Sequence, residues 1–571
     1  MKKKIYNLLD LFAGAGGLSN GFEQTGKFKV AGAIEINDAA QKTYIKNHGN
    51  NQEIILRDKD GKSDITKIIF KQVKEYLQLD SGSTVVVGGP PCQGFSNANR
   101  QKNYLISGNN QLVKEFVRAI DEIKPIAFVM ENVKTMQSST HKFFVTKNKH
   151  AAKGDYSSIS HLKSLTSEEN PIYQLDNIEL LKTNNLTQEF FTEIHALSDV
   201  PLPIISQTDL LIRLRTLQRR FSKSNRIELK NKKEIGEIEE TLSLISNYPT
   251  QNPILVDLLI DIKQFLSQLL KESITSDDLI TSFVKFNEYN RFLTRCQELK
   301  DEEIDCLKLD ILQESEFIVA KAKVYSYNLV DYLEKVFIHY GYSVKYKVLD
   351  SSKYGVPQKR KRFIMMGVKN RNLELDLPDE LPSDKYTVKD AILDLEDIEP
   401  QKDLFEYNAE IYSAKQFKSP LVGYYREKLN HTDTLHNHIN TNSSPLIQRR
   451  FEEIRMTNGK NFHSLSDELK SSYSDASRTQ NTVYLRLNYD EPSPTVVNVR
   501  KSMWQHPRKA RALSVREAAR LQSFQDSFRF YGRKDEQYQQ VGNAVPPLLA
   551  KGIASTLLKN LDKLQRKDSS E

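Results

Sequence analysis

The sequence is short of cysteine. Its 571 residues include only Cys92, Cys296 and Cys306. Three cysteines spaced so widely exclude a disulfide framework and a zinc cluster. Such low cysteine usage is typical of a reducing compartment, so we expect a cytoplasmic protein without a metal.

Long apolar runs are also missing. No uncharged segment is long enough to cross a bilayer, which excludes a transmembrane helix. The start, MKKKIYNLLDLF, is basic as in a signal peptide, but Asp10 interrupts its apolar run and no cleavage site follows. We therefore expect a first β-strand at Ile5–Phe12 and no membrane partner.

A strong surplus of charge of one sign is absent as well. The chain carries 82 Lys and Arg against 74 Asp and Glu, a formal net charge of +8. This surplus is compatible with a polyanionic partner, but it is also typical of an ordinary solvated surface. Charge alone does not decide whether the protein binds nucleic acid.

The N-terminal part, residues 1–139, alternates short apolar runs with helical patterns. This rhythm is typical of an α/β fold with a doubly wound, mostly parallel sheet. Residues 110–125 form an amphipathic helical pattern that Pro125 ends. The further strands predicted here are Val30–Ile36, Thr84–Gly88 and Ile126–Glu131.

The α/β rhythm is interrupted and then resumes. Residues 140–322 are polar, poor in glycine and periodic as in helices, which predicts a helical insertion. The catalytic α/β part continues over 323–369 with a helix and two strands, and 370–480 reads as a small irregular domain. Residues 481–565 are helical again, and 566–571 read as a disordered tail. The helix and strands predicted after the insertion are Val324–Tyr340, Val344–Leu349 and Arg362–Gly367.

A glycine-rich turn follows the first predicted strand. In DLFAGAGGLSNGFE, Gly14, Gly16 and Gly17 allow a tight turn and close approach of a ligand, but the spacing is not that of the dinucleotide fingerprint. Glu35 ends the next strand, where a carboxylate can accept hydrogen bonds from both ribose hydroxyls. Asp64 can meet the amino edge of an adenine, or simply cap a helix. An adenosine site without a phosphate cradle fits S-adenosylmethionine better than NAD.

The stretch GGPPCQGFS places Cys92 directly after a predicted strand. Two prolines fix the backbone before it and Gly94 frees the chain beyond, so a thiol can be held rigidly beside a moving loop. A thiolate that adds to carbon 6 of cytosine turns carbon 5 into a nucleophile. This chemistry needs an acid at ring nitrogen 3, and Glu131 ends the next strand. A buried, inert cysteine is the alternative, and we prefer it for Cys296 and Cys306.

Two arginines are candidate site residues in addition to Cys92 and Glu131. In YGVPQKRKRF, Arg360 and Arg362 alternate along an extended segment and so face the same side. An arginine there can clamp the cytosine carbonyl oxygen and a phosphate. A merely solvated basic strand edge is the alternative.

These motifs, with ENV, LSVREAARLQSF and QVGNAVPP in the same order, resemble those of the cytosine-5 DNA methyltransferases. The resemblance covers about 1–136 and 324–565 and leaves the insertion outside. It implies that Cys92 is the nucleophile, that Glu131 engages cytosine nitrogen 3, and that Arg362, assisted by Arg360, contacts the carbonyl oxygen. It also implies that S-adenosylmethionine is bound by Phe12, Gly14, Gly16, Gly17, Leu18, Glu35, Asp64, Ile65, Pro90, Asn543, Ala544 and Val545.

The resemblance further implies a double-stranded DNA substrate whose target cytosine is flipped out of the helix. The loop after Cys92 would act as a lid, with Ser96, Arg100 and Lys102 on the DNA, and residues 370–480 would recognise the target sequence. Gln525 departs from the proline that the family often has there, and the insertion is the larger departure. It could widen the DNA footprint, bind a partner or decorate the surface.

The resemblance therefore predicts a DNA cytosine-5 methyltransferase, the modification enzyme of a bacterial restriction system. A cognate restriction endonuclease would share its site without touching it. Two alternatives stay open: a tRNA cytosine-5 methyltransferase of the same fold, and a catalytically silent DNA-binding scaffold. The long 370–480 segment favours DNA over tRNA, and the presence of Cys92, Glu131 and Arg362 together favours an enzyme.

Overall fold

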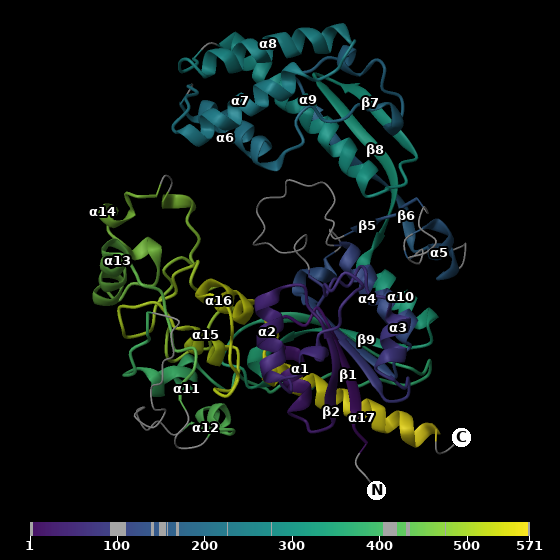
Figure 1. The fold of residues 1–571 in the computed structure, drawn as a ribbon, viewed down its shortest axis with the longest axis vertical. Helices are drawn as coiled ribbons and strands as arrows, with labels where there is room; N and C mark the ends of the chain where they lie inside the picture. The colour runs from purple at the N-terminus through teal and green to yellow at the C-terminus, as the bar shows by residue number, and fades with distance from the viewer. Residues whose placement is uncertain are drawn as a thin grey trace. The chain divides into compact units, whose positions relative to one another are not determined.

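The computed structural model describes residues 4–91, 110–138, 142–147, 156, 158–166, 171–224, 226–275, 277–402, 419–429, 434–473 and 476–568. The chain divides into two compact units (Figure 1). The first comprises residues 1–96, 111–138 and 333–571, and the second comprises 97–110 and 139–332. Each unit has its own hydrophobic core.

A six-stranded sheet forms the centre of the first unit. Its first four strands run parallel, and the fifth is antiparallel to both of its neighbours. The predicted α/β fold with a mostly parallel sheet is confirmed, because apolar runs bounded by turn residues mark each strand. In spatial order the strands are β2 (Phe28–Ile34), β1 (Tyr6–Leu11), β3 (Thr84–Gly88), β4 (Ala127–Val133), β10 (Lys361–Val368) and β9 (Ser343–Asp350).

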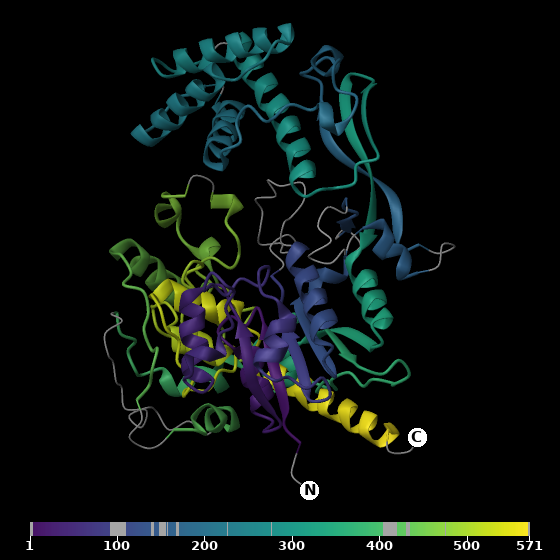
Figure 2. The ribbon, with the colours of Figure 1, turned by 45° about the vertical axis from the view of Figure 1, so that its right-hand side comes forward.

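Helices cover both faces of this sheet. On one face α1 (Gly17–Glu23) and α17 (Pro547–Asp568) bury Phe22 and Leu557 against β1–β4 (Figures 1 and 2). On the other face α4 (Asn110–Ile123) and α10 (Leu329–His339) pack through Phe116 and Phe337 onto Phe128 of β4. The remaining helices beside the sheet are α2 (Asp38–Asn47), α3 (Phe70–Tyr76), α15 (Val515–Leu521) and α16 (Lys534–Asn543).

The described part of residues 370–480 is irregular, as predicted. It holds short helices joined by loops and no strand in the residues that the structure describes. The helices are α11 (Val388–Ile392), α12 (Pro420–Arg426), α13 (Pro445–Met456) and α14 (Asp467–Lys470). The prediction of a disordered tail at 566–571 is wrong for 566–568, because α17 continues to Asp568.

The second unit is not purely helical, which corrects the predicted helical insertion. Its antiparallel sheet pairs β8 with β5, β6 and β7, and β8 occupies the start of the helix predicted at Val324–Tyr340. Side chains alternate along β8, with Ala320, Ala322 and Val324 buried, so a period of two marks a strand. The strands are β5 (Lys142–Phe144), β6 (Tyr173–Thr183), β7 (Lys308–Glu314) and β8 (Phe317–Asn328).

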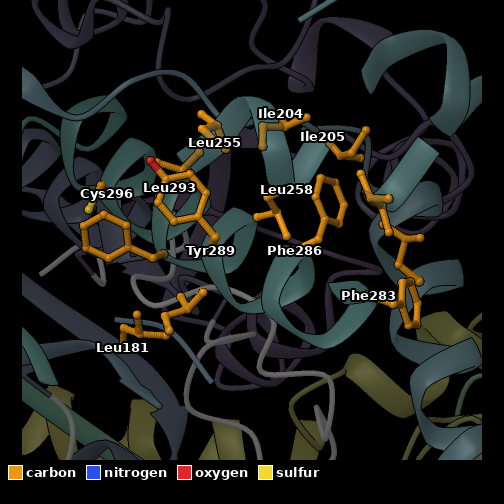
Figure 3. Packing of buried hydrophobic residues seen from close by; sticks show 14 of the residues in the cluster. Leu181, Ile204, Ile205, Leu255, Leu258, Phe283, Phe286, Tyr289, Leu293 and Cys296 are labelled. Atoms are coloured by element: carbon orange, nitrogen blue, oxygen red, sulfur yellow. The ribbon is translucent and has the colours of Figure 1, made fainter. Parts of the chain in front are cut away.

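Five α-helices in the described residues complete the second unit. Figure 3 shows part of its core, where Leu255 and Leu258 of α8 meet Phe286, Tyr289 and Leu293 of α9. The leucines predicted to share one helical face, such as those of α8, are buried in this core. The helices are α5 (Ile159–Ser164), α6 (Thr208–Ser224), α7 (Lys232–Ser246), α8 (Pro253–Leu269) and α9 (Asp277–Asp301). None of the described helices is long and apolar enough to span a membrane.

Candidate active site

The candidate site residues lie at one edge of the six-stranded sheet. The glycine-rich turn follows β1, Glu35 follows β2, Pro90 follows β3, and Glu131 lies near the end of β4. These four strands are parallel, so their carboxyl ends meet at the same edge. Ligands of open α/β sheets bind at this edge, where the strand order reverses around the first strand.

The turn after β1 needs residues that accept a left-handed backbone. Phe12, Gly14 and Gly16 have φ values of 60°, 55° and 94°. A Cβ at Gly16 would lie 2.3 Å from Nε2 of His48, so only glycine fits there. Phe12 holds the same conformation with a half-buried ring, at a cost of about 1–3 kcal/mol that is typical of functional sites.

The two ends of the chain meet beside this turn. A Cβ at Gly17 would lie 2.3 Å from the carbonyl oxygen of Val545 and 3.4 Å from the Cβ of Ala544. Gly21, one turn further along α1, is equally close to the carbonyl oxygen of Pro547. The QVGNAVPP segment is therefore next to the first glycine-rich turn, as the resemblance implied.

Glu35 is held by two backbone hydrogen bonds. The N–H of Gly14 donates to one carboxylate oxygen and that of Asn37 to the other, each at 2.8 Å. Burial raises the pKa of Glu35, and these hydrogen bonds pull it back down. Each oxygen keeps a further lone pair, so the fixed carboxylate can still accept hydrogen bonds from ligand hydroxyls.

Asp64 and Ile65 lie in a loop that is tied to Glu35. The N–H of Glu35 donates to the Ser63 hydroxyl at 3.1 Å. One carboxylate oxygen of Asp64 caps a turn by accepting from the N–H and hydroxyl of Thr66, which is the capping role considered above. Ile65 is buried and its carbonyl accepts from Arg118 of α4 at 2.8 Å. An adenine contact by Asp64 stays a prediction.

Glu131 and Arg362 form an ion pair at the end of β4. Nε of Arg362 lies 2.7 Å from a carboxylate oxygen of Glu131, and both side chains are largely buried. A Cβ at Gly89 would come within 2.9 Å of the other carboxylate oxygen. The segment that leads into the cysteine motif thus passes directly beside this carboxylate.

A hydrogen bond from β4 fixes the start of the cysteine motif. The amide of Asn132, which is buried, donates to the carbonyl of Pro90 at 3.1 Å. Cys92, Ser96, Arg100 and Lys102 lie outside the described residues, so their predicted roles stay predictions.

Arg360 takes a different position from the one expected. Its buried guanidinium donates to the carbonyl oxygens of Val496 at 2.9 Å and Gly542 at 3.0 Å, whereas Arg362 pairs with Glu131. Burial, together with repulsion from Arg362, lowers the pKa of Arg360. Two of its nitrogens are thus engaged by backbone carbonyls, and the role predicted for Arg360, which is to assist Arg362 at the active site, stays a prediction.

Sequence reasoning missed the segment around Val496. Its carbonyl accepts from Arg360, and a Cβ at Gly542 would come within 2.6 Å of the Val497 backbone. Asn543, which follows, has its side-chain oxygen held by the amide of Gln539 at 2.8 Å. No local pattern marks this segment, because its partners are distant in the sequence.

A buried polar group under the glycine-rich turn was also missed. The hydroxyl of Ser19 donates to Asp10 at 2.5 Å and lies 2.8 Å from that of Tyr44, while Nδ1 of His48 lies 2.6 Å from Glu23. Burial raises the pKa of Asp10 to about 7. The available signal was Asp10 itself, the one charge in an apolar strand.

Three comparisons with known proteins show what the chain is similar to. A family model described as C-5 cytosine-specific DNA methylase matches residues 6–163 and 321–559. The chain is 34% identical over 221 residues to the type II methyltransferase M1.HphI of Haemophilus parahaemolyticus, covering 38% of this chain and 49% of that protein. It is 25% identical over 582 residues to the DNA (cytosine-5-)-methyltransferase M.ApeKI of Aeropyrum pernix, covering 98% of this chain and 99% of that protein.

Coverage differs among these relatives. The chain spans about half the length of M1.HphI and of M.XorII from Xanthomonas oryzae, for which the shares are 49% and 54%. A solved structure described as a DNA modification methyltransferase encoded within a prophage of E. coli aligns with a TM-score of 0.50 at 18% identity, over 98% of this chain and 99% of that one. This structural likeness concerns the fold alone.

Proposed function

The chain belongs to the family of C-5 cytosine-specific DNA methylases, and from this premise we propose that it methylates carbon 5 of cytosine in duplex DNA, with S-adenosylmethionine as the methyl donor. The observation that carries the proposal is the ion pair of Glu131 and Arg362 beside Gly89. A carboxyl group and a hydrogen-bond donor thus lie beside Gly89, which precedes Cys92 by three residues.

The residues around the glycine-rich turn fit the proposed cofactor. Glu35 presents a fixed carboxylate for ribose hydroxyls, and the turn at Gly14–Gly17 leaves backbone open to close approach. Phe12 adds a half-buried ring, and Ala544 and Val545 complete the edge from the far end of the chain. When bound, S-adenosylmethionine supplies an electrophilic methyl group.

The chain's own residues would prepare the base. The Cys92 thiolate uses its electron pair to form a bond to carbon 6, and the ring π electrons that this displaces shift toward nitrogen 3. Glu131, once it has taken up a proton from water, gives that proton to nitrogen 3, and Arg362 holds both Glu131 and the carbonyl oxygen. After carbon 5 has taken the methyl group it loses its proton to water. The bond between sulfur and carbon 6 then breaks, which restores the thiolate, and nitrogen 3 returns its proton to Glu131.

The proposed reaction is favoured if Arg362 and Glu131 keep the same relative position before the substrate binds. Arg362 also donates from NH1 to the Lys361 carbonyl at 2.9 Å, which fixes the guanidinium beside the carboxylate. A pair held in place before binding costs no reorganisation during the reaction.

We further propose that the target cytosine is flipped out of the helix, because a stacked base does not expose carbon 6 to a thiolate. The loop containing Ser96, Arg100 and Lys102 would close over the base and contact phosphates, and residues 370–480 would read the sequence. The names of the type II relatives support a modification role beside a restriction endonuclease.

The first experiment maps the product. Mixed-sequence duplex DNA is incubated with the purified protein and S-adenosylmethionine, and methylated cytosines are read by conversion sequencing. A recurrent methylated sequence is expected. Methylation of tRNA but not of duplex DNA, run in parallel, would contradict the proposal.

A second experiment tests the covalent step. A duplex with 5-fluorocytosine at the mapped position should trap a protein–DNA adduct that survives denaturation, because fluorine blocks the final loss of a proton. Cys92→Ser should abolish the adduct, while the matched control Cys306→Ser, in the second unit, should retain it. An adduct that forms equally well with Cys92→Ser would disprove the assigned nucleophile.

A further inference from the structure

Two glutamines that the sequence motifs contain, and to which no role has been assigned, are fully buried. Gln358 belongs to YGVPQKRKRF, where it precedes β10, and Gln522 belongs to LSVREAARLQSF, where it follows α15. Neither side chain is exposed to solvent. A buried amide destabilises the fold unless its oxygen and its nitrogen have hydrogen-bond partners, so these partners indicate what each side chain holds in place.

The two amides form a chain of hydrogen bonds that runs in one direction. The N–H of Val496 donates to the Gln358 oxygen at 2.7 Å, and the Gln358 nitrogen donates to the Gln522 oxygen at 2.9 Å. The Gln522 nitrogen donates in turn to the carbonyl oxygen of Val541 at 2.7 Å. The Gln358 nitrogen donates as well to the carbonyl oxygen of Leu521, at 3.2 Å. We call the chain from Val496 through Gln358 and Gln522 to Val541 the amide relay.

The backbone groups at the two ends of the relay fix the orientation of both amides. Val496 presents a donor, so only the oxygen of Gln358 can face it, and Val541 presents an acceptor, so only the nitrogen of Gln522 can face it. The nitrogen of Gln358 and the oxygen of Gln522 are then left to bond to each other. Reversing either amide would bring two donors or two acceptors together, so the relay has a single satisfied arrangement.

The relay joins three segments that are distant in the sequence. Gln358 lies just before β10, the strand that carries Arg362. Val496 follows the proposed target-recognition domain. Val541 lies in the last turn of α16, directly before the residues Gly542–Val545, which lie against the glycine-rich turn. The relay therefore connects the strand of the proposed active-site arginine to the proposed cofactor edge.

Arg360 makes a second connection between the same segments. It donates to the carbonyl oxygens of Val496 and Gly542. The Val496 peptide is thus held at its N–H by Gln358 and at its carbonyl by Arg360. A Cβ at Gly542 would come within 2.6 Å of the Val497 backbone, so the segments are in direct contact. The end of α16 is consequently held in place from the side of β10.

We propose that Gln358 and Gln522 are positioning residues for the cofactor. Through the amide relay they hold Gly542–Val545 where this edge completes the S-adenosylmethionine site. A buried polar network in which every group is satisfied is rigid, and an edge that is rigid before binding loses little entropy when a ligand binds. The inference rests on the proposed function and deepens it, because it gives LSVREAARLQSF a part in binding the methyl donor.

Gln358→Met and Gln522→Met each break the relay with a side chain of similar length. We expect the Kd for S-adenosylmethionine, measured by isothermal titration calorimetry without DNA, to rise about tenfold in each variant. The KM for the cofactor should rise by the same factor. The kcat at saturating cofactor should change by less than about twofold, because the reacting groups are untouched. If Gln522→Met does not fold, Gln358→Met alone gives the comparison.

The double variant tests whether the two glutamines act as one chain. Loss of either amide already breaks the relay, so Gln358→Met with Gln522→Met should raise the Kd by no more than about tenfold. Two independent structural effects would instead multiply to about a hundredfold. A hundredfold rise would overturn the inference.

Asn560→Leu is the matched control. Asn560 is as fully buried as the two glutamines, and its amide exchanges two hydrogen bonds with the backbone of Asp376, at 2.8 Å and 3.0 Å. It lies roughly 20 Å along α17 from the start of this helix at Pro547. Asn560→Leu should lower the Tm as the glutamine variants do, but should leave the Kd unchanged. A raised Kd in this control would show that loss of stability alone weakens binding, and would overturn the inference.

The outcomes separate this inference from the proposed function. Unchanged Kd values in both single variants overturn the inference, even if the unmodified protein methylates DNA. Weakened cofactor binding in the variants of a protein that methylates no cytosine sustains the inference and contradicts the proposed activity. An unmodified protein that binds no S-adenosylmethionine contradicts both.

Discussion

Gly17→Ala tests how closely the two ends of the chain meet at the proposed cofactor edge. The added Cβ would lie 2.3 Å from the carbonyl oxygen of Val545 and 3.1 Å from the ring of Phe524. An ordinary contact needs 3.4 Å or more, so the α16–α17 connection must move away by roughly 1 Å. Overpacking of this kind lowers the free energy of unfolding by about 1–3 kcal/mol. The higher helix propensity of alanine offsets up to about 1 kcal/mol of this loss.

The effect should fall on cofactor binding more than on stability, because the displaced residues are Ala544 and Val545. We expect the Kd for S-adenosylmethionine, measured by isothermal titration calorimetry, to rise about tenfold, equivalent to about 1.4 kcal/mol. Gly423→Ala is the matched control. Gly423 also lies in a helix of the first unit, α12, and a Cβ there meets nothing within 4 Å. An unchanged Kd with an unchanged Tm for Gly17→Ala would refute the close approach.

Three further predictions concern buried groups. Folding raises the pKa of Asp10 from 3.8 to about 7, so the folded unmodified protein keeps this proton to a higher pH than the unfolded chain does. The unfolding free energy of the unmodified protein should therefore fall by on the order of 4 kcal/mol between about pH 4 and 7. Asp10→Asn should remove this pH dependence. Urea unfolding at both ends of that range checks this, and parallel profiles for the two proteins would disprove it. Arg360→Met leaves the carbonyls of Val496 and Gly542 without their donor. We expect the Tm to drop and the KM for the cofactor to rise. A change in kcat alone would speak against a positioning role. Glu35→Gln replaces one of two acceptors by a donor, and we expect S-adenosylmethionine to bind at least about tenfold more weakly with little change in Tm; equal affinity would exclude the ribose contact.

Much of the first unit could be predicted because its signals are local. Strand Thr84–Gly88 is an apolar run between turn residues, and its bounds were predicted to the residue. The turn at Gly14 and Gly16 is marked by glycine itself, since few other residues accept its backbone conformation. Glu35 and Glu131 could be placed at the same sheet edge because each ends a parallel strand.

The misses have two causes: partners that are remote in the sequence, and a strand pattern that runs directly into a helical one. Alternation along a strand predicts the side on which Arg360 projects. It does not predict that Arg360 donates to the carbonyl oxygens of Val496 and Gly542 on that side. The sheet of the second unit was missed because the alternating pattern of β8 runs directly into the helical pattern of α10, and the longer helical period was extended backwards.

The meeting of Gly17 with Val545 bears on how the protein is made. Translation delivers the glycine-rich turn several hundred residues before its counterpart, so a nascent chain carries an incomplete edge at the proposed cofactor site until Val545 has been made. Closing so large a loop is slow compared with forming local helices. The proposed cofactor should therefore bind only after Val545 has been made, and a chain cut before Val545 should fail to retain S-adenosylmethionine, however well its sheet has formed.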